Sequence, residues 1–323
     1  MVDLATGFVA RGLPTVVMNR RGYGGLPLAD GAPIALFGFD EDLDAVLVEV
    51  ARRFPGRGVA LIGFSCGAGF AGRYGHTSAL SAWAEAPAAA DGRGPPKPKL
   101  LCTVCLDPGY NCRPEGAVAR ISPPYSWILT ALLKWVYVFR HRAALSKRSP
   151  SSPALCRDLL SPRAGLAATY KGLRRLSGEF GSSAWLDIQQ PRIGETKVPT
   201  LLINSVDDPI LVWENVEEAK AEMLENANCV LAELRRGSHG CKYDFFGLDT
   251  RAEPMIGEFI LSAWRELRAQ QRREAYPMGA GPGASSLFHL LACGVDLSSP
   301  NEAKPSASSQ PPAHDQPAPK RVY

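Results

Sequence analysis

The feature that most constrains the fold is a short apolar strand that runs straight into a glycine-rich turn. Residues 58–62 read GVALI, an apolar run typical of a strand covered on both faces. Residues 63–67 read GFSCG, a G-x-S-x-G sequence, and small residues follow it. This spacing indicates a sharp strand-to-helix turn with Ser65 in a strained conformation, where the flanking glycines remove Cβ atoms that would clash. The sequence therefore predicts a strand–turn–helix unit that lifts the Ser65 hydroxyl above a sheet.

A second motif overlaps the start of the predicted helix. Residues 67–72 read GAGFAG, which has the G-x-G-x-x-G spacing of a dinucleotide-binding loop. In that loop the first glycine makes the strand-to-helix turn, whereas here the turn falls at 63–65 and Gly67 would lie inside the helix. We interpret these glycines as allowing close packing of the helix on the sheet, which disfavours a nucleotide site.

Predicted strands and helices alternate along most of the chain. The strands are expected at 15–19, 58–62, 100–106, 198–204 and 229–234, and the helices at 2–13, 40–54, 66–83, 214–226 and 255–270, with Asp40 as an N-cap. This order implies an α/β fold with a mostly parallel sheet covered on both faces. Residues 108–197 lose the alternation and are expected to form a helical lid within a domain spanning 1–275. Residues 276–323 are rich in Pro, Ser and Ala and are expected to be a disordered tail, with 86–99 an exposed loop.

Composition and charge exclude several functional classes. The 323 residues include 36 basic and 32 acidic ones, a net charge of +4 that is too balanced to indicate nucleic-acid binding. Cys102 and Cys105 are three apart in a strand-like run, so they face opposite ways and are expected to be buried free thiols rather than zinc ligands. No signal peptide is evident, and the longest apolar stretch, 125–139, contains Lys134 and is shorter than the ~20 residues needed to span a bilayer. We expect a protein of the cytoplasm or a membrane periphery, with 125–139 a cap helix that touches lipid.

A serine hydroxyl needs a base to accept its proton and an acid to orient that base. In folds with this turn the chain order is serine, acid, histidine. His239 lies in GSHG at 237–240, a glycine-flanked turn directly after the last predicted strand. The other histidines are less well placed, close to the turn in sequence, in a basic run or in the tail: His76, His141, His289 and His314. We therefore select His239 as the base.

Two adjacent aspartates follow the strand predicted at 198–204. Residues 205–209 read SVDDP, and carboxylates at the carboxyl end of a parallel strand face the crevice where His239 must also lie. We favour Asp208, immediately before Pro209, as the acid that orients His239. Asp207 is then a turn residue that caps local N–H groups. Asp207 and Asp107, which ends the strand predicted at 100–106, remain alternatives for the acid.

Three blocks in the same order resemble the YheT-like branch of the α/β-hydrolases, which includes embryogenesis-associated proteins and the abhydrolase-domain type 1 and type 3 lipases. The blocks read VVMNRRGYGG at 16–25, GFSCG at 63–67 and PTLLINSVDDP at 199–209. The resemblance covers residues 1–270 and is weakest through the lid. It implies a serine esterase or lipase that uses Ser65, Asp208 and His239 on acyl esters or phospholipids, without a metal or cofactor. The Cys66 N–H would be an oxyanion donor.

The chain departs from that branch at its N-terminal side. The branch has, before the helix corresponding to 2–13, a central strand ending in a His-Gly-Leu-x-Gly-like loop that supplies a second oxyanion N–H. In the sheet, this strand would lie between the strands predicted at 15–19 and 58–62. We expect it to be missing, which would weaken both the sheet and the activity. Two other interpretations therefore stay open beside the hydrolase: a catalytically silent binding protein of the same fold, and an acyltransferase.

Overall fold

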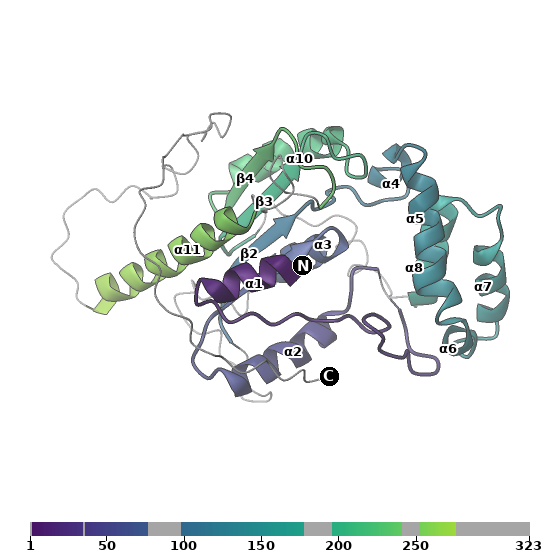
Figure 1. Cartoon of the computed structure of the whole chain (residues 1–323), viewed down its shortest axis with the longest axis horizontal. Helices are drawn as coiled ribbons and strands as arrows, with labels where there is room; N and C mark the ends of the chain where they lie inside the picture. Colours follow the sequence, from purple (N-terminus) through teal and green to yellow (C-terminus); the bar gives the residue numbers. More distant parts are fainter. Residues whose placement is uncertain (1, 35, 77–97, 178–195, 241–251, 276–323) are drawn as a thin grey trace, which may run out of the picture. The chain divides into compact units, whose positions relative to one another are not determined.

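Within the described part of the chain, four parallel strands form a sheet (Figure 1). They are β1 (Val59–Phe64), β2 (Leu100–Leu106), β3 (Thr200–Ser205) and β4 (Cys229–Leu234), hydrogen-bonded in the order β1-β2-β3-β4. The computed structural model describes residues 2–34, 36–76, 98–177, 196–240 and 252–275. β2 and β3 are buried along their whole length, as expected for parallel strands covered on both faces.

Helices cover both faces of the sheet. α1 (Val2–Ala10) and α11 (Ala252–Ala275) pack on one face, where Phe8, Ile256 and Val104 share a core cluster. α3 (Cys66–His76) and α10 (Trp213–Glu225) cover the other face, where Ala68 and Val216 pack with Cys105. Side chains of a strand alternate between its faces, so neighbouring residues of β2 enter different cores. The α/β fold with a parallel, doubly covered sheet is therefore confirmed.

Helix α2 (Asp40–Arg53) lies against α3 through Leu43 and Leu47. Its N-cap is Phe39, so the predicted cap at Asp40 is wrong by one residue. Asp40 is instead the first helical residue, and its carboxylate forms an ion pair with Arg73 of α3. Here a contact between two helices, which the local sequence does not reveal, determines how the acidic side chain is used.

The strand predicted at 15–19 is wrong. Described residues 13–20 belong to no strand, and Val16 and Val17 are exposed. In the described part of the chain β1 pairs with β2 along one edge only. A β-prone segment becomes a strand only when a neighbour supplies its hydrogen bonds, and no described strand lies beside this one.

The predicted lid is mostly helical from residue 117 onward, where the structure describes it. It contains α4 (Ala117–Arg120), α5 (Tyr125–Leu133), a π-helical segment η1 (Lys134–Phe139), α6 (Arg142–Ser146), α7 (Ser152–Leu160) and α8 (Leu166–Ser177). Val138, Leu145 and Leu176 form a separate core there with Leu36 and Phe37 of the preceding segment. Cys66 packs against this core, so the helical region touches the turn that carries Ser65.

No helix among the described residues is long and apolar enough to cross a membrane. The stretch 125–139 is helical as predicted and divides into α5 and η1. Several predictions lie outside the described residues, namely the end of the helix after Ser65, most of the loop at 86–99, the last part of the lid and the tail at 276–323.

Candidate active site

Ser65 lies between the last residue of β1 and the first residue of α3, in a left-handed backbone conformation with φ of +52°. Such a conformation is strained for a residue with a side chain and clusters at functional sites. The Ser65 N–H donates to the carbonyl of Leu106 at 2.9 Å, which ties the turn to β2. A Cβ at Gly63 would overlap the Gly67 carbonyl group, so the first glycine of the motif is required by space. The sequence thus forms the expected strand–turn–helix unit.

His239 lies in the turn after β4, and its Nε2 is 3.0 Å from the Ser65 Oγ. The imidazole lies beside the ring of Phe64, with 5.2 Å between the ring centroids. Two neighbours have positive φ, Ser238 at +47° and Gly240 at +79°. A Cβ at Gly240 would overlap the Phe64 ring, so glycine lets this turn lie close to β1. Residues 174 apart in sequence therefore meet at hydrogen-bond distance.

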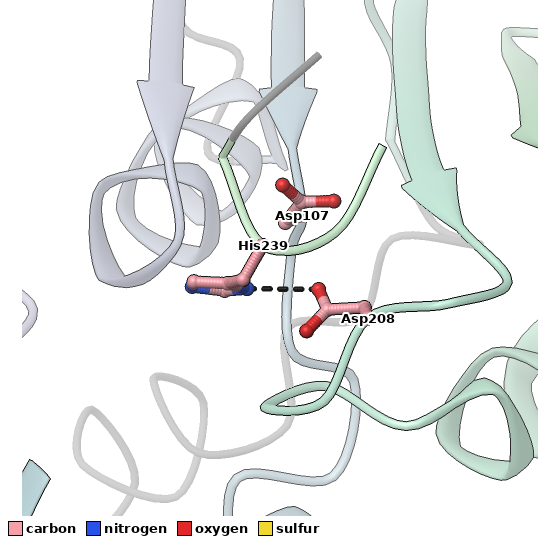
Figure 2. Close-up of side chains that lie close together, drawn as sticks. All are labelled: Asp107, Asp208 and His239. Atoms are coloured by element: carbon pink, nitrogen blue, oxygen red, sulfur yellow. Dashed lines mark hydrogen bonds and ion pairs between the residues drawn. The ribbon is translucent and has the colours of Figure 1, made fainter. Parts of the chain in front are cut away.

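Asp208 holds the other side of the imidazole, with its Oδ2 2.8 Å from His239 Nδ1 (Figure 2). Its Oδ1 accepts hydrogen bonds from the N–H groups of Ile210 at 2.8 Å and Leu211 at 2.9 Å, and the side chain is buried. Burial by itself raises the pKa of Asp208, but the hydrogen bond and charge of His239 and the two N–H donors together bring that pKa below its ordinary value. The carboxylate is thus ionised and fixed in orientation.

The two alternative aspartates hold the backbone around His239 instead of its ring. Asp207 Oδ1 accepts hydrogen bonds from the N–H groups of Gly237 and Ser238, at 2.9 and 2.8 Å. Asp107, fully buried at the end of β2 with φ of +46°, accepts the Gly240 N–H at 2.8 Å through Oδ2. Figure 2 shows Asp107 and Asp208 approaching the histidine turn from two different loops. Asp207 was predicted to cap local N–H groups, whereas the N–H groups it accepts lie 30 and 31 residues away in sequence. The contact of Asp107 with Gly240 was not predicted, and the available signal was that both aspartates follow strands.

Asp107, Asp208 and His239 also place potential metal-ligand atoms within 4.8 Å of one another. One oxygen of Asp208 already bonds the imidazole, and one oxygen of Asp107 already accepts a backbone N–H. The geometry is therefore better explained by hydrogen bonding within the turn than by a metal site. Cys102 and Cys105, the other pair considered for zinc, lie in the cores on opposite faces of the sheet.

Cys66 is the first residue of α3, so its N–H belongs to the helical turn whose donors have no acceptor within the helix. This N–H follows the serine directly, where an oxyanion donor is expected. Burial raises the pKa of the Cys66 thiol, an effect that the nearby Arg20 charge only partly offsets. The thiol is therefore protonated at neutral pH and is a poor competitor of Ser65 as nucleophile.

The fold and the order of these side chains define a class. A parallel, doubly covered sheet, a G-x-S-x-G turn with a strained serine, and the chain order Ser65, Asp208, His239 are the features of the α/β-hydrolase fold.

Comparisons with known proteins find structural likenesses at low identity. No protein-family model and no curated protein matches the chain. Among solved structures, a monoacylglycerol lipase of Paleococcus ferrophilus aligns with 15% identity and a TM-score of 0.42, covering 80% of this chain and 88% of the lipase. An esterase of Pyrococcus furiosus aligns with 17% identity and a TM-score of 0.37, over 68% of this chain and 60% of the esterase. A lipase-esterase related protein of Clostridium acetobutylicum has 13% identity and a TM-score of 0.41, with 81% and 87% covered.

Proposed function

We propose that the protein is a serine hydrolase of carboxylic esters that acts through an acyl-enzyme. The observation that carries this proposal is the hydrogen-bonded series from Ser65 Oγ to His239 Nε2 and from Nδ1 to Asp208, at 3.0 and 2.8 Å. Serine is a weak nucleophile alone and needs a base at this distance, itself oriented by a third group. The buried, ionised carboxylate of Asp208 fits that orienting role.

In the proposed reaction His239 Nε2 accepts the Ser65 hydroxyl proton while Oγ attacks the ester carbonyl carbon. The oxygen of the tetrahedral intermediate accepts a hydrogen bond from the Cys66 N–H. His239 then returns its proton to the departing alcohol, which leaves the acyl group on Ser65. A water molecule, deprotonated by His239, attacks this acyl-enzyme and releases the acid, and the proton returns to Ser65. Asp208 stabilises the imidazolium at both stages.

We propose acyl lipids or small acyl esters as the substrates, with phospholipids among the lipid candidates. The support is the resemblance of three sequence blocks to the YheT-like branch, together with the apolar core of the helical region that packs against Cys66. No metal or cofactor takes part in this proposal. The location we propose is the cytoplasm or the periphery of a membrane.

A fluorophosphonate probe tests the proposal directly. Ser65 should be labelled covalently because His239 activates its hydroxyl, and Ser65→Ala should abolish labelling. Ser149→Ala, at an exposed serine of the helical region, is the matched control and should label like the parent protein. Equal labelling of the Ser65→Ala variant, mapped by peptide mass spectrometry to another residue, would rule out Ser65 as the nucleophile.

A second candidate, a silent or weakly active binding protein of the same fold, is favoured by one observation. β1 has a described neighbour on one edge only, and the expected second oxyanion donor belongs on the other edge. Loss of one oxyanion donor lowers turnover by about 10²–10³. Rapid labelling of Ser65 without measurable ester turnover would favour this candidate.

A further inference from the structure

The charge of the chain is concentrated in one set of helices. Residues 125–177, which run from α5 to α8 and are called the lid layer below, contain ten of the 36 basic residues and one of the 32 acidic residues. Their formal net charge is +9, whereas the whole chain carries +4, so the remainder carries −5. Asp158 is the single acidic residue of the layer. A surface so deficient in carboxylates matches an anionic partner.

The same layer exposes a continuous apolar stripe. Five large side chains of α5 and η1 are each 51–69% exposed, and these are Trp127, Ile128, Leu132, Trp135 and Phe139. Their spacing of one, five, eight and twelve residues places them on one side of a helix. Trp135 and Phe139 stack with 4.7 Å between their ring centroids. α5 has no buried residue at all, so this stripe is not a core face in the described part of the chain.

A basic pocket in the layer adjoins the helix that carries the stripe. It has a volume of about 430 Å³ between α7 and α8. Three basic residues line it, Arg163, Lys171 and Arg175, together with one carboxylate, that of Asp158. Ser161 also lines this pocket, and its backbone carbonyl accepts a hydrogen bond from the ammonium group of Lys134 at 2.7 Å. Lys134 is the first residue of η1, so the pocket adjoins the helix that carries the stripe.

We propose that the lid layer docks on the surface of a bilayer that contains anionic phospholipid. The apolar stripe would enter the boundary between headgroups and acyl chains, where Trp is favoured. The basic side chains would contact the headgroups. Nucleic acid also attracts cations, but a contiguous stripe of Trp, Ile, Leu and Phe gains most from an apolar phase. Neither attraction depends on Ser65, so docking is separable from the proposed hydrolysis.

Flotation of the full chain with vesicles tests this proposal. The protein should bind vesicles of phosphatidylcholine with phosphatidylserine, and bind vesicles of phosphatidylcholine alone at least about tenfold more weakly. Trp127→Ala/Trp135→Ala should weaken binding by about tenfold or more, because the inserted apolar area is lost. Trp264→Ala, at a tryptophan of α11 that is 51% exposed, is the matched control and should bind like the parent protein.

Charge reversal provides the second test. Lys171→Glu/Arg175→Glu in the pocket should weaken binding to the anionic vesicles by at least about tenfold. Arg57→Glu/Lys99→Glu changes the net charge equally at exposed residues outside the layer, and it should have little effect. Ser65→Ala should still bind, which separates a failure of docking from a failure of the proposed catalysis. Variants are compared only after circular dichroism shows an unchanged melting temperature.

Three results would overturn the proposal. The first is equal binding of both vesicle types by the parent protein and the lid-layer variants. The second is tighter binding to a DNA duplex, measured by anisotropy, that the tryptophan variant retains. The third is a dimer without vesicles that the tryptophan variant converts to monomer, because the stripe would then be an interface between copies of the chain.

Discussion

At the scale of single residues, three aspartates with the same chemistry have three different partners. Asp208 bonds the ring of His239, Asp207 bonds the backbone before it and Asp107 bonds the backbone after it. Asp208→Asn should therefore lower ester turnover by about 10⁴, because the amide favours the wrong imidazole tautomer. The measurement is kcat for a chromogenic ester.

Asp207→Asn and Asp107→Asn are the matched comparisons for this loss. An asparagine keeps a side-chain oxygen that can accept the same backbone N–H groups, so both variants should retain much more activity than Asp208→Asn. Asp107→Ala removes the acceptor of a part-buried hydrogen bond from the exposed Gly240 and should cost about 0.5–1.5 kcal/mol of stability. If Asp207→Asn or Asp107→Asn lost as much turnover as Asp208→Asn, the acid would have to be reassigned.

Asp208 should also leave a signature in the pH dependence of stability. Burial raises its pKa, but the contacts with His239, Leu211 and Ile210 lower it below the ordinary value overall. A carboxyl group with a lower pKa in the folded state stabilises that state above its unfolded pKa of about 4, and this contribution is lost as the pH falls through the folded value. Urea unfolding should therefore show the largest stability difference between parent and Asp208→Asn near neutral pH, shrinking in acid. A difference that grew in acid would contradict the assigned direction.

At the scale of elements, a buried hydrogen bond joins the loop after β2 to strand β3. The Tyr110 hydroxyl, after β2, donates to Asn204 Oδ1 of β3 at 2.6 Å. Tyr110→Phe would leave this buried oxygen without its donor and should destabilise the protein by about 1–3 kcal/mol. Thermal unfolding measures the effect, with Tyr125→Phe at an exposed tyrosine of α5 as the control. An unchanged melting temperature would show that the oxygen finds another donor.

The elements that the sequence predicts best are those whose own residues determine them. β4 at 229–234 and β2 at 100–106 match their predicted ranges. A short apolar run bounded by turn residues has few secondary structures available to it other than a buried strand. The strand at 15–19 failed because a strand also needs a neighbour, which its own residues do not encode. The site follows the same rule. Ser65, His239 and Asp208 were identifiable from turns and chain order, whereas the contacts of Asp107 with Gly240 depend on how two distant loops pack.

At the scale of the whole molecule, the charge separation between the lid layer and the rest of the chain has a consequence in solution. A net charge of +9 in the layer and −5 elsewhere should make copies attract one another at low ionic strength. The Debye length falls from about 30 Å at 0.01 M salt to about 8 Å at 0.15 M, so added salt should weaken this attraction.

Light scattering should therefore give a second virial coefficient that rises with sodium chloride, and Lys171→Glu/Arg175→Glu should flatten this dependence. Apolar contacts and strand pairing have the opposite tendency, because salts that strengthen apolar burial favour them. If association grew with salt, the contact would have to run through the exposed stripe of α5 and η1 or along the edge of β1 that faces away from β2. The sign of the salt dependence thus distinguishes charge attraction from apolar contact or strand pairing as the interaction that governs association between copies of the chain.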